Sequence, residues 1–313
     1  MRSRFLLGLL LFSLILIGCR GQAETNTVRV AVLPVLDALP IHVAAAQGYY
    51  QDQGLEVVIV PVSSAPERDA LMQSGQVDAI LNEVVSTIFY NQEESRVVSV
   101  RFLRAASSEY PLFRILAAKD SGIRTVEDLK GVEVGISEGT VIHYTTQRML
   151  QNAGLVEDEI QTIAIPKIPD RIALLVSGEL AAANLPDPAA SAAILQGAVA
   201  VVDDTTVPEI SHSVLTFNAE MAADNPQTVR RFLQAIEQAV VDINADKNAW
   251  IDLMVELELL PPPLVGKYAI PDFPTASVPS QEQFNDAVNW ALELGFISSP
   301  VEYQRSVSAD YLP

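Results

Sequence analysis

Side chains able to hold a small polar molecule follow several of the strands that the sequence predicts. The relevant strands are expected near 28–34, 55–62, 77–81, 132–136 and 180–184. In open parallel sheets, ligands bind beyond the carboxyl ends of the strands. This rule nominates as ligand contacts Asp37, Leu39, Ser63, Ser64, Arg68, Asn82, Glu83, Ser107, Ser137, Glu138, Gly139, Thr140, His143, Asn184 and Asp187.

Several of these residue types have a structural alternative. Ser64 and Ser137 are equally suited to capping a helix. Arg68 can pair with a neighbouring carboxylate on a solvated face, and His143 can be a packing residue. Asp37 and Glu83 have no obvious local partner in the sequence, so they are the stronger candidates. The segment 137–140 precedes a predicted helix, whose free N–H groups can hold a polar or anionic group.

The charges among these candidates predict the chemistry of a ligand. Carboxylates stand at positions 37, 83, 138 and 187, against the single arginine at 68. A pocket for a small oxyanion concentrates hydrogen-bond donors and cations. The sequence therefore favours a neutral or cationic polar heterocycle over a small oxyanion.

Residues for catalysis or metal binding do not gather in the sequence. Cys19 is the one cysteine, and the three histidines, His42, His143 and His212, are too far apart for a metal-ligand motif. The sequence contains neither a G-x-S-x-G nucleophile motif nor a phosphate-binding G-x-x-x-x-G-K-[ST] loop. We therefore expect no catalytic residue, no metal and no cofactor.

The elements that would position these side chains alternate between strands and helices. Further strands are expected near 97–103, 112–118, 161–165 and 212–217, with helices near 40–48, 66–74, 141–153, 169–177 and 225–245. Gly48 is the expected stop of the first helix. This alternation predicts an α/β fold with mostly parallel sheets.

An internal repeat supports two similar halves. Residues 67–79 and 170–182 are identical at six of thirteen positions, and each copy follows a proline. Each copy is predicted to run from a helix through a Ser-Gly turn into a strand. Two copies about 100 residues apart predict two lobes with the same local topology, although any helix-glycine-strand unit has some of this pattern.

The amino terminus resembles a bacterial export signal. Arg2 and Arg4 precede the uncharged stretch 5–18, which is shorter than the about 20 residues that span a bilayer. The stretch ends in Leu-Ile-Gly-Cys, which resembles a lipobox and implies cleavage before Cys19 and acylation of its sulfur. We expect a signal peptide over 1–18 and a lipidated tether over 19–26. The alternatives are a transmembrane anchor or a buried cysteine placed here by chance.

Composition limits the partners. The net charge is −19, which argues against nucleic acid and against broad contact with anionic lipid, and 49% of the residues are hydrophobic, enough for a large core. The segment 219–313 differs from the rest. It predicts amphipathic helices over 225–245 and 281–294, the second capped by Ser280, that complete the first lobe.

A set of short motifs now resembles a known family. Strand 28–34 is followed by Gly48-Tyr49-Tyr50 and by Gly54-Leu55-Glu56-Val57. Further along come Asp128-Leu129-Lys130-Gly131, the segment 139–144 with Gly154-Leu155, and the segment 185–188. Their order and spacing are similar to the sulfonate/nitrate/thiamine-precursor group of solute-binding proteins, also called SsuA/THI5-like or NMT1.

The resemblance implies a type II periplasmic-binding-protein fold. Its two lobes would cover 27–110 plus 212–313 and 111–211, with crossovers near 105–118 and 205–215. It also implies a small-molecule ligand in the cleft and an ABC permease with a separate ATPase subunit. The protein would be a monomer without nucleic-acid partners, lipid-anchored to the outer face of the cytoplasmic membrane or in the periplasm.

Three other functions remain open. The first is an oxyanion-binding protein of the sulfonate or nitrate type. The second is an enzyme like the thiamine-pyrimidine synthases, which resemble this chain but carry a cysteine-rich, iron-associated motif that it lacks. The third is a lipoprotein that uses the binding fold to signal through a partner.

Overall fold

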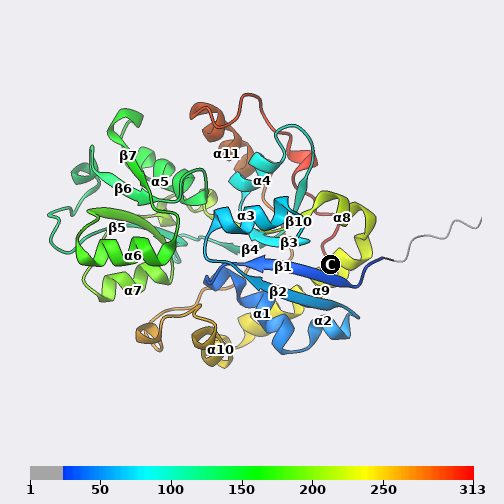
Figure 1. The fold of residues 1–313 in the computed structure, drawn as a ribbon. Helices are drawn as coiled ribbons and strands as arrows, with labels where there is room; N and C mark the ends of the chain where they lie inside the picture. The colour runs from blue at the N-terminus through cyan, green and yellow to red at the C-terminus, as the bar shows by residue number, and fades with distance from the viewer. Residues whose placement is uncertain (1–23) are drawn as a thin grey trace, which may run out of the picture.

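Two five-stranded sheets form the two lobes of the protein (Figure 1). The computed structural model describes residues 24–313, so the expected signal peptide and Cys19 lie outside the described residues. The first sheet holds β1 (Thr27–Val32), β2 (Glu56–Pro61), β3 (Ala79–Asn82), β4 (Val97–Ala105) and β10 (His212–Asn218). The second holds β5 (Phe113–Ala117), β6 (Glu133–Ile136), β7 (Gln161–Ala164), β8 (Ala182–Pro186) and β9 (Val199–Asp203).

The two sheets have matching topologies. Their strand orders are β2-β1-β3-β10-β4 and β7-β6-β8-β5-β9. The chain crosses between the lobes twice, after β4 and after β9, and the strand that follows each crossing runs antiparallel to its neighbours. The predicted α/β fold with two lobes and two crossovers is therefore confirmed, with one reversed strand in each sheet.

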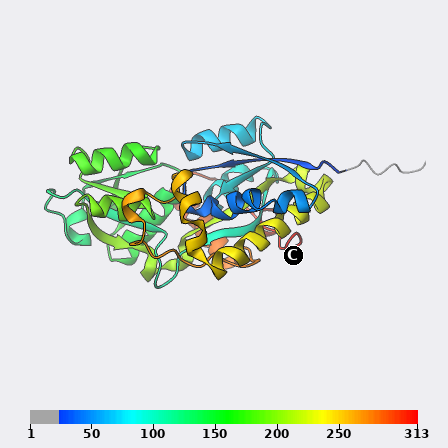
Figure 2. The ribbon, with the colours of Figure 1, turned by 90° about the horizontal axis from the view of Figure 1, so that it is seen from below.

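Helices cover both faces of the first sheet (Figures 1 and 2). One face packs on α1 (Leu39–Ala46) and α9 (Pro226–Ala245), next to the short α2 (Tyr49–Asp52) and α8 (Ala219–Asp224). The other face packs on α3 (Ala65–Gln73) and α4 (Val84–Tyr90). In α9, buried Phe232, Ile236, Ala239 and Ile243 recur every three or four residues, which places one apolar stripe on the core.

The second sheet is covered in the same manner. Helix α5 (Val141–Asn152) packs on one face, while α6 (Ile168–Ser177) and α7 (Ala189–Leu195) share a separate apolar cluster on the other. Local caps set where the helices begin. The side chains of Ser64 and Thr140 accept hydrogen bonds from backbone N–H groups in the first turns of α3 and α5.

The carboxyl-terminal segment, which was expected to complete the first lobe, also contacts the second lobe. The short turn Pro262–Leu264 packs against α7. Helix α11 (Gln281–Glu293) begins at the predicted Ser280 cap and lies between α4 and α5. The remaining helix of this segment is α10 (Ile251–Glu256). Long side chains such as Trp290 reach across from α11 to α5, a contact that helical periodicity alone does not reveal.

Candidate functional site

The carboxyl ends of the two sheets meet along one line, here called the facing edge. Arg104, at the end of β4, donates a hydrogen bond of 2.8 Å to the carbonyl oxygen of Asp187, which follows β8. Further along, a Cβ atom placed on Gly139 of the second lobe would lie 3.5 Å from the ring of Phe89 in α4. The strand ends nominated by the sequence therefore belong to one interlobe region.

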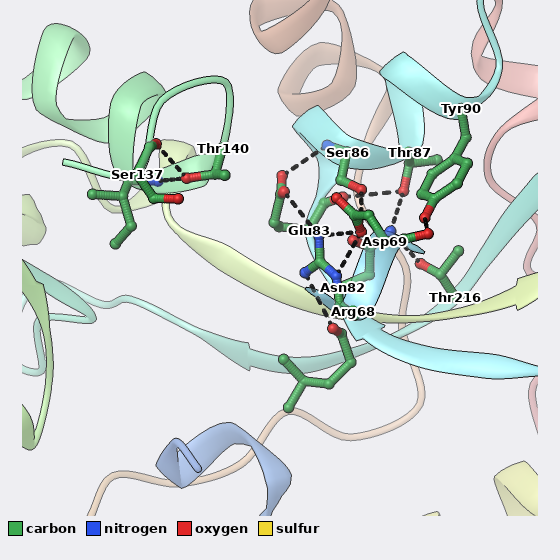
Figure 3. A network of polar contacts seen from close by, with 12 residues as sticks. Arg68, Asp69, Asn82, Glu83, Ser86, Thr87, Tyr90, Ser137, Thr140 and Thr216 are labelled. Carbon is green, nitrogen blue, oxygen red and sulfur yellow. Dashed lines mark hydrogen bonds and ion pairs between the residues drawn. The ribbon is translucent and has the colours of Figure 1, made fainter. Parts of the chain in front are cut away.

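A buried ion cluster forms the first-lobe side of this edge (Figure 3). Arg68 forms an ion pair of 2.8 Å with Asp69, and its Nη2 lies 3.6 Å from Oε1 of Glu83. Glu83 is also the cap of α4, because its Oε2 accepts a hydrogen bond from the backbone N–H of Ser86. The alternative that the sequence offered, a pairing of Arg68 with a neighbouring carboxylate, is thus present, and its arginine is buried while Asp69 is 26% exposed.

Asn82 lies beside this cluster in a fully buried hydroxyl network. Its Nδ2 donates to Oγ1 of Thr87 at 3.2 Å and of Thr216 at 3.3 Å. Ser99 completes the network with contacts of about 3 Å to both threonine hydroxyls. The amide is therefore held in one orientation, and its Oδ1 atom accepts no hydrogen bond from residues 24–313.

Ser137, Thr140 and Asn184 form the second-lobe side. Thr140 rather than Ser137 caps α5, and its hydroxyl donates to the Ser137 carbonyl at 2.8 Å. Asn184 donates to the Ile142 carbonyl at 3.1 Å and to the hydroxyls of Thr145 and Thr146. Figure 3 places Ser137 and Thr140 across from Arg68 and Glu83.

Four buried oxygen atoms of the nominated residues have no hydrogen-bond partner among the residues that the structure describes. They are Asn82 Oδ1, Glu83 Oε1, Ser137 Oγ and Asn184 Oδ1. Both ring nitrogens of His212, Oγ of Ser213 and Nη2 of Arg68 likewise make no hydrogen bond to the described chain. A buried polar group without a partner costs about 1–3 kcal/mol, so native proteins seldom leave several together. Three of the four atoms are acceptors when Glu83 is ionised, and they suit a molecule that brings N–H or O–H donors.

Asp37 and Asp187 have partners that the sequence did not show. Asp37 lies 3.4 Å from Nη1 of Arg104. Asp187 lies 2.5 Å from Nε of Arg114 and also accepts from Ser191. Both carboxylates are nearly fully buried, and they tie the first crossover to the strand ends of both lobes. The fold thus adds Arg104 and Arg114 to the edge, two cations that the charge count from the nominated residues did not include.

The other nominated residues have varied surroundings. Leu39 is fully buried at the start of α1, and Glu138 is exposed. Ser63 donates to Glu67, and Ser107 accepts from the N–H groups of residues 109 and 110 within its own loop. Gly139 takes a positive φ of 65° in the turn before Thr140. His143 packs edge-on against Trp290 and Phe296, and burial lowers its pKa to about 4.

Three residues of the edge were missed by the sequence reasoning: Arg104, His212 and Ser213. His212 and Ser213 are buried at the start of β10, whose register places Val214 beside Asn82. The reversed direction of β10 hid them, because the rule of carboxyl strand ends does not apply to an antiparallel strand. Arg104 carried a detectable signal, since an arginine in an apolar strand is rarely buried without partners.

The site is separate from a hollow on the surface between two helices. That hollow, of about 1060 Å³, lies between α5 and α11 and is lined mainly by polar residues such as Arg148, Asp286 and Glu293. None of the nominated residues lines it. Across residues 24–313, no three His, Cys, Asp or Glu side chains gather as a metal site, and no helix is long and apolar enough to cross a membrane.

Glu83 gives the site a testable pH dependence. Burial raises its pKa to about 7, and Arg68 and the Ser86 N–H offset this only in part. Between pH 4.5 and 7 the folded protein therefore holds a proton that the unfolded chain has released, so the free energy of unfolding falls as pH rises. Glu83→Gln should remove this loss, which we expect to be about 2–3 kcal/mol.

The measurement is urea unfolding of the wild type and of Glu83→Gln at several pH values from 4.5 to 8. Other titrating groups are common to both proteins and cancel in the difference. Parallel curves over this range would show that Glu83 titrates normally.

The two lobes and the facing edge define the fold of the chain as the two-lobed periplasmic-binding-protein fold. The alkanesulfonate-binding protein SsuA of Xanthomonas axonopodis pv. citri, solved with MOPS bound, superposes with a TM-score of 0.78 at 18% identity. The match covers 92% of this chain and 99% of that chain. At this identity the likeness concerns the fold.

A family model identifies the family of this chain. The family model described as NMT1/THI5 like matches residues 36–248, and the chain belongs to this family. The resemblance inferred from the sequence motifs is therefore confirmed.

Named relatives differ in what they bind or make. A protein of Escherichia coli K12 named for binding aliphatic sulfonates is 31% identical over 49% of this chain and 48% of its own length. The yeast 4-amino-5-hydroxymethyl-2-methylpyrimidine phosphate synthase THI11 is 28% identical over 68% of this chain and 65% of its own. The riboflavin-binding protein RibY of Chloroflexus aurantiacus is 21% identical over 92% and 86%. The chain thus spans about half the length of the sulfonate-binding relative and slightly under two thirds of the length of the yeast synthase.

Proposed function

We propose that this protein is an extracytoplasmic solute-binding protein that closes its lobes on a small polar molecule and delivers it to an ABC importer. The observation that carries the proposal is the set of four buried oxygen atoms of the nominated residues, two from each lobe, that accept no hydrogen bond from the described chain. A molecule held between them satisfies both sides at once, so binding favours the closed arrangement of the lobes.

The ligand that best fits these atoms carries hydrogen-bond donors. Asn82 and Asn184 present acceptor oxygens, because their amide nitrogens are already bonded. An amino-substituted or N–H-bearing heterocycle, such as a vitamin precursor, supplies such donors. A bare oxyanion supplies none and would face the carboxyl of Glu83. The names of the riboflavin-binding relative and of the pyrimidine synthase support a heterocycle, and the name of the sulfonate-binding relative supports the oxyanion alternative.

The cellular setting follows from the sequence features and remains part of the proposal. The lipobox at Cys19 would anchor the mature protein at the cell envelope, with 19–26 as the tether. The lobes would be 27–110 with 212–313, and 111–211, with the third segment also bracing the second lobe. Binding, rather than synthesis of a pyrimidine, is favoured because residues 24–313 contain no cysteine.

Calorimetry with two ligand classes tests the proposal. Small molecules released from natively purified protein are identified by mass spectrometry and titrated back, beside an alkanesulfonate series. We expect micromolar binding of a donor-bearing heterocycle, weakened about tenfold or more in Ser137→Ala through loss of one hydrogen bond to the ligand. Ser177→Ala, at the far end of α6 in the same lobe, is the matched control. Binding of the alkanesulfonates alone would overturn the heterocycle and leave the oxyanion alternative.

A further inference from the structure

Two buried arginines occupy equivalent positions in the internal repeat. Arg68 lies in the first half of α3 and Arg171 in the first half of α6, 103 positions further along the chain. Their exposed fractions are 2% and 0%. The repeat therefore allows a direct comparison of one guanidinium in two similar settings.

In the first lobe, carboxylates of the same lobe compensate the charge of the Arg68 guanidinium. Nη1 of Arg68 donates to the Leu81 carbonyl at 3.2 Å. Nε and Nη2, which form one edge of the planar group, both lie 2.8 Å from Oδ1 of Asp69. Burial alone would lower the pKa of Arg68, yet the carboxylates of Asp69 and Glu83 raise it. The Nε–Nη2 edge thus holds a carboxylate.

In the second lobe, the corresponding edge holds nothing from the described chain. Nη1 of Arg171 donates to the carbonyls of Ile165 at 2.6 Å and Pro166 at 3.2 Å, which fix the plane of the group. Nε and Nη2 have no hydrogen-bond partner among residues 24–313. The repeat places Ile172 where the first lobe has Asp69. Without a counter-charge, burial lowers the pKa of Arg171 to about 10.

Such an arrangement is costly for a protein with no use for it. A buried charge that lacks a partner is strongly unfavourable, whereas a guanidinium edge matches the paired oxygens of a carboxylate, sulfonate or phosphate. An apolar side chain would fill the same space at lower cost. The cost is offset once an oxyanion occupies the edge.

Arg171 lies next to the facing edge. Its partner Ile165 follows β7, and the Ile165 N–H donates to the carbonyl of Ile136, the last residue of β6. The next residue is Ser137, whose unpartnered Oγ was described above. Pro166 and Lys167, which follow Ile165, are exposed, whereas Arg171 itself is fully buried.

We infer that the Nε–Nη2 edge of Arg171 is an oxyanion-binding subsite of the second lobe, specific for a sulfonate, carboxylate or phosphate group. This subsite is a separate proposal, and it does not depend on the donor-bearing ligand proposed above. A ligand that carries both an N–H donor and an anionic group would use both features.

Two nearly isosteric variants test the subsite. Ile172→Asp places a carboxylate where the first lobe has Asp69. This carboxylate should pair with the Nε–Nη2 edge of Arg171 and exclude an added anion from it. Ile172→Asn places a neutral side chain of the same shape there and leaves the charge of Arg171 uncompensated. Both variants keep Arg171 itself, and any general effect of a polar residue at position 172 is common to both.

Each protein is titrated with sodium sulfate or sodium methanesulfonate, and the midpoint of its thermal unfolding is measured at each concentration. Sodium chloride at equal ionic strength is the control. We expect a saturable rise in midpoint for the wild type and Ile172→Asn. In Ile172→Asp the apparent affinity should fall at least about tenfold, as loss of a charged hydrogen bond implies. Without added anion, Ile172→Asp should melt at a higher temperature than Ile172→Asn.

Equal responses of the two variants to sulfate, or no saturable response in the wild type, would overturn the subsite. Arg171→Lys gives a second measurement, because lysine keeps the charge but not the paired donors. It should weaken the response at least about tenfold, and an unchanged response would also overturn the inference. Neither result bears on heterocycle binding, which is measured separately by calorimetry.

Discussion

Replacing Arg104 by methionine should lower the free energy of unfolding by about 3–5 kcal/mol, since it breaks a buried charge cluster by removing one partner. The guanidinium of Arg104 is 1% exposed. It contacts Asp37, the carbonyls of Pro111 and Asp187, and the hydroxyl of Tyr268. Its loss would leave Asp37 buried without a cation in the described chain and leave the carbonyls of Pro111 and Asp187 without this donor.

These contacts also explain why the effect should be larger than that of an ordinary ion pair. They come from the β1–α1 connection, the first crossover, the end of β8 and the carboxyl-terminal segment. Arg104 therefore holds together the point where the lobes are joined. Burial alone would lower its pKa, yet Tyr268, Asp37 and Asp187 raise it, so the charge persists at all working pH values.

Urea and thermal unfolding followed by circular dichroism measure this effect. The matched control is Arg96→Met, because Arg96 is 57% exposed and paired with an exposed Glu94. That change should shift stability by no more than about 0.5 kcal/mol. A loss below about 1 kcal/mol for Arg104→Met would mean that the cluster contributes little to the joined lobes.

Replacing Trp290 by alanine should cost about 3–5 kcal/mol, the range for truncating a large buried aromatic side chain. The indole is 0% exposed and lies within 5.4–5.5 Å, between ring centroids, of His143, Tyr144 and Phe296. Its Nε1 donates to Oε1 of Gln147 at 2.9 Å. The change therefore removes both packing and a buried hydrogen bond between α11 and α5.

Two further variants separate these contributions. Trp290→Phe keeps most of the aromatic surface but leaves the Gln147 oxygen unpartnered, so a smaller loss of about 1–3 kcal/mol is expected. Asn289→Ala, on the exposed side of the same helix, should change stability by less than about 0.5 kcal/mol. If Trp290→Ala and Asn289→Ala have the same free energy of unfolding, α11 does not stabilise the contact between the lobes in the way that its contacts indicate.

Regular elements with strong local patterns could be predicted from the sequence. The strand predicted at 55–62 is β2, and the helix predicted at 225–245 is α9, each within about two residues. Gly48 with its φ of 78° and the Ser280 cap have the expected roles. In these cases a short window of residues carries the whole signal, because capping and periodicity are local effects.

Other elements could not be predicted because their surroundings decide them. Helix α4, Val84–Tyr90, is rich in β-branched residues that favour strands. It is helical because Glu83 caps it and because its first five residues are buried between the sheet and α11. The short β9 was missed for a similar reason, since only its pairing with β5 makes it a strand.

The sequence by itself determined the family, the alternation of strands and helices, and the strand ends where polar residues gather. Only the tertiary structure decided which charges meet. It paired Asp37 and Asp187 with arginines far along the chain, buried Arg68 against Asp69, and left one edge of Arg171 without a hydrogen-bond partner in the described chain. Charges act over a few ångströms of space rather than over sequence distance, so their balance at a site is fixed only when the sheets have brought their ends together.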